Sequence, residues 1–89
     1  MTHPDAARLF EHAQQAAGVI AAKHRGDLAG AEALLAGFPD DPARVRAFCL
    51  LAELALSLVR AQTGQSMDDL VRKLSLHMAA APLQPPPGT

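Results

Sequence analysis

Aromatic residues are almost absent from this sequence: the 89-residue chain has three Phe and no Trp or Tyr. Without them, the core must be built mainly from Leu, Val and Ala. Each buried Ala contributes little, because burial yields only about 25 cal/mol per Å² of apolar surface. A chain of this length also buries only about 60 to 65% of the surface that it exposes when unfolded. We therefore expect modest stability, which makes burial between two copies of the chain physically attractive.

Cysteine is equally scarce, and long apolar runs are missing. The lone Cys49 excludes an internal disulfide and fits a reducing cytoplasm. The longest apolar stretch, residues 47–59, is interrupted by Glu53 and Ser57 and is far shorter than the roughly 20 residues that span a membrane. No basic and apolar leader opens the sequence. We therefore expect a cytoplasmic protein without membrane contact, and the abundance of Ala, and of Arg over Lys, favours a bacterial origin.

A strong charge of either sign is also lacking. The formal net charge is -1 at pH 7, with eight Lys and Arg residues scattered among nine acidic ones. Such a chain has no basic patch of the kind that attracts phosphate backbones or anionic lipids. The composition therefore argues against a non-specific nucleic-acid-binding protein.

The first two helices are predicted from apolar spacing and from signals at their ends. Thr2 can cap a first helix whose apolar stripe runs to Ile20, and Gly26 can take the left-handed conformation that ends it. Asp27 can then cap a shorter second helix, in which the last apolar residue is Phe38.

A third helix, predicted over residues 43–62, is apolar around most of its circumference. Asp41 is its expected N-cap, with Pro42 at the first helical position. At about 100° per residue, its central polar side chains fall within a sector of about 60°. They are Arg46, Glu53, Ser57 and Arg60. The other sides of this helix must be covered, either by the neighbouring helices or by a second chain.

The fourth helix is predicted to begin after Ser66, which can accept a hydrogen bond in a capping box with Asp69. Its apolar residues form one stripe at helical spacing, made of Met67, Leu70, Val71, Leu74, Met78 and Ala81. Leu76 lies opposite this stripe, so we expect it to be exposed in a monomer.

These signals predict an all-α fold, a small four-helix up-down arrangement around a central hydrophobic third helix. We expect residues 1–81 to form a single helical domain, and residues 82–89 to form a disordered proline-rich tail. The second and fourth helices are short, so dimerisation should complete the cover of the third. The predicted interface consists of Phe48, Leu51, Leu54, Ala55, Leu58 and Leu76.

No set of residues indicates catalysis, a cofactor or a metal. None of the four histidines has a second histidine three or four positions away, the spacing that offers two ligands on one helix face. Cys49 has apolar flanks within a helix, which is typical of a packed small side chain rather than a nucleophile. We therefore expect a protein that is not an enzyme.

Arg44 and Arg46 stand in the first turns of the third helix, where positive charge opposes the helix dipole. One interpretation is that they contact an anion or an acidic partner. The alternative, which we favour, is that they form ion pairs with Asp40, Asp41 or Glu53.

The function most consistent with the sequence is a non-enzymatic helical protein-interaction module, or a small accessory or regulatory protein, that acts as a homodimer or with another protein. The alternative is a DNA-binding transcription regulator in which residues 50–80 form a helix-turn-helix-like segment. Asp68 and Asp69 at the start of its recognition helix would face phosphates, which disfavours this alternative.

Overall fold

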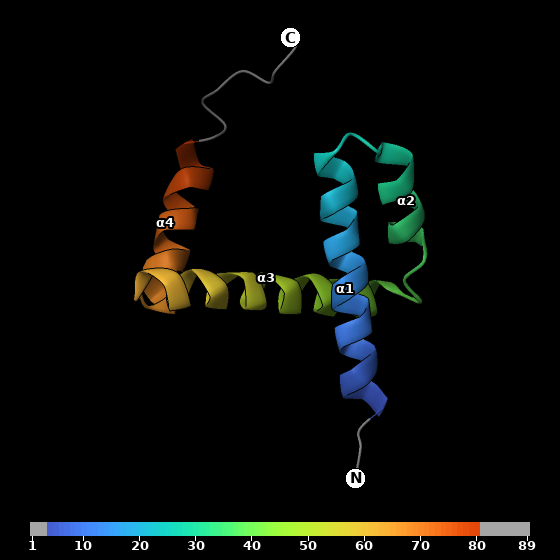
Figure 1. Ribbon diagram of the computed structural model, residues 1–89, viewed down its shortest axis with the longest axis horizontal. Helices are drawn as coiled ribbons and strands as arrows, with labels where there is room; N and C mark the ends of the chain where they lie inside the picture. Colours follow the sequence, from blue (N-terminus) through green and yellow to red (C-terminus); the bar gives the residue numbers. More distant parts are fainter. Residues whose placement is uncertain (1–3, 81–89) are drawn as a thin grey trace. The chain divides into compact units, whose positions relative to one another are not determined.

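The computed structural model describes residues 4–80, with side chains from residue 6 onward. This part of the chain forms four helices and no strand, which confirms the all-helical prediction (Figure 1). The helices are α1 (Pro4–His24), α2 (Leu28–Ala36), α3 (Asp41–Thr63) and α4 (Met67–Ala80). The predicted cap at Thr2, the domain end at residue 81 and the tail at 82–89 lie outside the described residues. The chain divides into two compact units, Met1–Leu54 and Ala55–Thr89, and α3 belongs to both.

The connection between α1 and α2 has the predicted chemistry. Gly26 has a φ of 83°, the left-handed conformation that favours glycine, and the Asp27 amide donates to the Ala22 carbonyl at 2.9 Å. The Asp27 carboxylate then accepts a hydrogen bond from the Gly30 amide at 2.9 Å, capping α2. Both end signals are therefore confirmed.

The start of α3 differs from the prediction by one residue. The Asp40 carboxylate accepts a hydrogen bond from the Ala43 amide at 2.8 Å, so Asp40 is the capping side chain and Asp41 already belongs to the helix. The prediction that Asp41 is the N-cap is wrong. Two adjacent aspartates offer the same capping chemistry, but the amide three residues after Asp41, that of Arg44, already donates to the Asp40 carbonyl. Pro42 is tolerated in the second position because the first amides of a helix have no intrahelical partner.

The junction of α3 and α4 contains a glycine that ends α3 and the predicted cap of α4. Gly64 has a φ of 73°, and its amide donates to the Arg60 carbonyl at 2.8 Å. The Ser66 hydroxyl accepts from the Asp69 amide at 3.1 Å, the predicted cap of α4. Within the second unit, α4 turns away from the last turns of α3 at this junction (Figure 1).

The first unit is built around two small groups of buried residues. α1 and α2 lie side by side and run antiparallel, and the first half of α3 crosses α1 (Figure 1). One group joins Ala16, Phe38 and Ala47, and the other joins Val19, Ala22 and Ala31. Leu35 and Phe48 pack against both groups and connect them. The up-down order is thus seen for α1 and α2, while the order of all four helices stays a prediction.

Two features of this core were not predicted. Phe38 follows the end of α2 instead of belonging to it, because α2 ends at Ala36 and Gly37 is its C-cap. It still enters the core, where it is buried. In addition, the Gln15 side chain donates to the Leu34 carbonyl at 2.8 Å, so a polar residue of α1 satisfies a carbonyl in the last turn of α2.

Ala16 is fully buried between α1 and the elements that cover it, so Ala16→Leu should lower the free energy of unfolding by about 1 to 3 kcal/mol through overpacking. Ala17→Leu is the matched control, because Ala17 is the exposed neighbour on the same helix and its change should stay within about 0.5 kcal/mol. Urea unfolding followed by circular dichroism measures both. Equal effects of the two substitutions would contradict the core as described.

Candidate functional site

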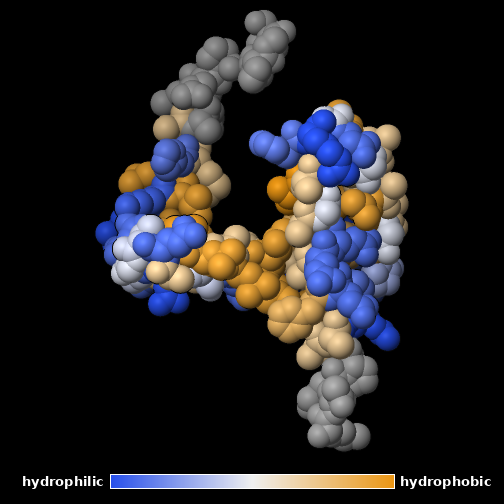
Figure 2. Space-filling model, viewed as in Figure 1, coloured by the Kyte–Doolittle hydropathy of each residue, from blue (hydrophilic) through white to orange (hydrophobic). Residues whose placement is uncertain are grey.

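The main feature of the second unit is apolar surface. Leu70 is its one buried residue among those described, and Leu56, Gln65 and Met67 are half-buried. All other described residues of the unit are exposed, including large apolar side chains from both of its helices. These side chains are Leu58, Val59, Val71, Leu74, Leu76 and Met78. Figure 2 shows the corresponding hydrophobic surface along α3 and on part of α4.

The residues predicted as an interface separate into two groups. Phe48 and Leu51 are half-buried and pack against the core of the first unit. Leu54, at the end of that unit, is exposed, as are Ala55 and Leu58 in the second unit. Leu76 is 65% exposed, as expected for its position opposite the stripe. The structure therefore gives Phe48 and Leu51 an intramolecular role and leaves the other four accessible.

Sequence reasoning missed part of this surface. Val71, Leu74 and Met78 belong to the apolar stripe of α4 and are not among the predicted interface residues, but all three are exposed. The helical period indicates which side of α4 is apolar, but it does not indicate what covers that side. The shortness of the neighbouring helices was the signal that the cover would be incomplete.

Arg44 takes part in the local structure of the first unit. Its guanidinium donates to the Asp41 carboxylate, one of the ion-pair partners considered above, and to the Leu35 carbonyl near the end of α2 at 3.3 Å. The latter bond ties the C-terminal end of α2, where carbonyls lack helical partners, to the first turns of α3. Arg44 therefore already has partners within the chain.

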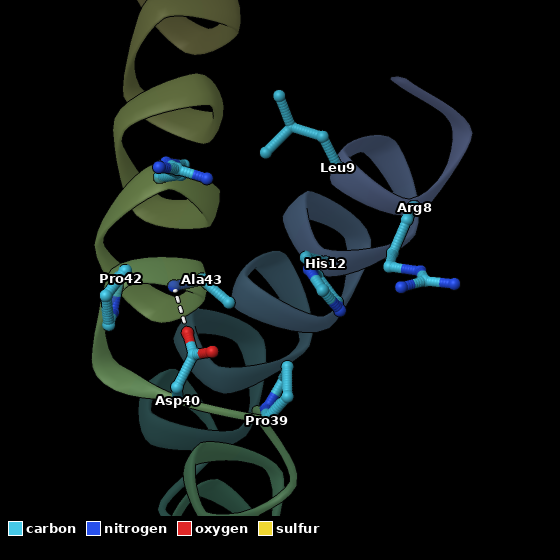
Figure 3. Close-up of a pocket in the computed structure, with 8 residues that line it drawn as sticks. Arg8, Leu9, His12, Pro39, Asp40, Pro42 and Ala43 are labelled. Carbon is cyan, nitrogen blue, oxygen red and sulfur yellow. Dashed lines mark hydrogen bonds between the residues drawn. The ribbon is translucent and has the colours of Figure 1, made fainter. Parts of the chain in front are cut away.

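Arg46 lies instead at an open pocket between α1 and the start of α3. The pocket has a volume of about 600 Å³ and is lined by Arg8, Leu9, His12, Pro39, Asp40, Pro42, Ala43 and Arg46. Figure 3 shows Leu9 extending from α1 toward α3, and the Asp40 carboxylate bonded to the Ala43 amide. The His12 ring stands edge-on to Phe38, with 5.8 Å between the ring centroids. The pocket is thus joined directly to the core.

The described residues include further His, Cys, Asp and Glu side chains. No three His, Cys, Asp or Glu side chains among them gather closely enough to hold a metal ion. Cys49 is exposed on α3, contrary to the packed position expected for it. No helix in the described part of the chain is both long and apolar enough to cross a membrane.

Comparisons of the chain with protein-family models, with curated proteins and with solved structures find no match. The surfaces of the molecule are therefore the basis for assigning a function.

Arg44→Lys should lower the free energy of unfolding by about 0.5 to 1.5 kcal/mol, because an ammonium group cannot reproduce both hydrogen bonds of the planar guanidinium. The control is Arg46→Lys, which should change stability by less than about 0.5 kcal/mol, since Arg46 is exposed. Thermal or urea unfolding distinguishes the two. If Arg44→Lys were neutral, the proposed link between α2 and α3 would be without energetic significance.

Proposed function

We propose that the protein is a non-enzymatic helical interaction module that self-associates as a homodimer through the exposed apolar surface of the second unit. The observation that carries this proposal is the near absence of buried residues in that unit, where only Leu70 is buried among the residues described.

Helix length strengthens the argument. α4 has 14 residues, and isolated helices shorter than about 12 to 15 residues are marginal in water. Such a helix draws most of its stability from packing its apolar face. Within the second unit that face has little to pack against, so a partner surface would supply the missing burial.

A second copy of the chain is the simplest partner. A two-fold interface uses the same patch on both subunits, so one exposed apolar surface is sufficient to form it. In this arrangement α3 and α4 of the two subunits would cover each other, completing the cover of the third helix that is expected from dimerisation. The biological role would be that of an accessory or regulatory protein, in which the dimer presents further surfaces to another protein.

The DNA-binding alternative receives less support from the surface charges. α3 and α4 flank a short connection as in a helix-turn-helix, but Asp68 and Asp69 occupy the first turn of α4. Arg72, one of the few cations that could offset them, lies 3.9 Å from the Asp69 carboxylate. The start of α4 is therefore poorly suited to approach phosphates.

Leu58→Asp should shift the protein from dimer to monomer, because it places a charge within the proposed apolar contact. Leu58 is 67% exposed, so its substitution disturbs no core within the chain. The matched control is Leu28→Asp, since Leu28 is 63% exposed but lies in the first unit at the start of α2. Light scattering coupled to size-exclusion chromatography measures the mass, and circular dichroism reports the folding of each variant.

We expect the wild type and the Leu28 variant to be dimers and the Leu58 variant to be a monomer. A wild-type protein that stays monomeric at all concentrations tested, with α4 folded, would remove the proposal.

A further inference from the structure

We propose that the pocket between α1 and the start of α3 binds an organic monocarboxylate that carries a short apolar chain. This pocket lies entirely within the first unit, so the inference is independent of the proposed self-association. Its volume of about 600 Å³ falls in the range of about 300 to 1,000 Å³ typical of small-molecule sites.

The charges that line the pocket select an anion. Arg8 and Arg46 come from different helices, and neither forms an ion pair or hydrogen bond with another residue whose side chain the structure describes. A ligand can therefore contact either guanidinium group without breaking an existing interaction. The planar donors of a guanidinium group match the two oxygens of a carboxylate.

Asp40 limits the charge that the pocket can accept. Its carboxylate offsets part of the positive charge of the two arginines, so the lining suits a monoanion better than a phosphate dianion. The Asp40 carboxylate also occupies one of the first free amides of α3, that of Ala43. The helix N-terminus is thus already capped, and the attraction for an anion comes from the arginine side chains.

The remaining walls favour a ligand with an apolar body. Leu9 and Ala43 contribute hydrocarbon from the two helices, and Pro39 and Pro42 contribute rings without a backbone N–H. These four residues offer few hydrogen-bond donors. His12 adds one ring that can donate to the carboxylate, because an imidazole always carries at least one N–H. A charged head at the arginines and a chain along Leu9 and the prolines would satisfy both parts of the pocket.

The test is a titration of the full-length ¹⁵N-labelled protein with hexanoate, followed by amide chemical shifts. We expect saturable shifts in the first half of α1 and in residues 39–46. Hexylammonium has a similar chain with the opposite charge and should leave these amides unchanged, while inorganic phosphate should bind more weakly than hexanoate. Arg46→Gln and Arg8→Gln should each weaken hexanoate binding about tenfold, the effect of losing one charge-assisted hydrogen bond.

Arg25→Gln is the matched control, because Arg25 directly follows α1 and lies outside the pocket. Its guanidinium group is 3.6 Å from the Asp27 carboxylate. It should bind hexanoate as the wild type does. The proposal is overturned if hexanoate produces no saturable shift, if hexylammonium shifts the same amides, or if phosphate binds as tightly as hexanoate. It is also overturned if Arg46→Gln and Arg8→Gln bind like Arg25→Gln. The comparison of ligands on the wild type stays decisive even if a variant fails to fold.

Discussion

The structure depends on the close packing of alanine between helices. Ala16, Ala22 and Ala47 are all fully buried, whereas no large side chain among the described residues is. Small residues at the contacts let helices approach closely, since the distance between helix axes depends on the side chains at the contact. Close packing fixes the geometry of the first unit, but alanine removes little apolar surface from water. The core is therefore well defined in shape and limited in the free energy that it provides.

Other interactions supplement the limited core of the first unit. Asp27 and Asp40 cap helices, Gln15 and Arg44 bind carbonyls near the end of α2, and Phe38 closes the core from a loop. Each satisfies a polar group or fills a volume that alanine cannot. In the second unit, the described residues provide a cap at Ser66 but no comparable core. Its two segments are helical as predicted, but most of their large apolar side chains are exposed.

The parts of the fold that the sequence predicts are those determined within a few residues. Asp27, Ser66 and the glycines at 26 and 64 act through hydrogen bonds to amides and carbonyls nearby in the chain, so their roles follow from spacing. Adjacent Asp40 and Asp41 show the limit of such rules, because spacing alone does not choose between them. Long-range roles were less accessible. Nothing in the local sequence of Arg44 indicates a bond to the Leu35 carbonyl, and no pattern relates Arg8 to Arg46 across 38 positions of the chain.

The apolar surface of the second unit and the pocket of the first unit also differ in how far local sequence predicts them. The apolar side of α4 could be derived from helical period, and its exposure follows from the lack of described partners in its own unit. The pocket arises only when α3 crosses α1, which brings Arg46 and Leu9 to the same opening. Because the crossing depends on small residues at Ala16 and Ala47, the packing of the core and the shape of the pocket have a common origin. Enlarging either alanine would displace α3 from α1 and change the pocket without altering any residue that lines it.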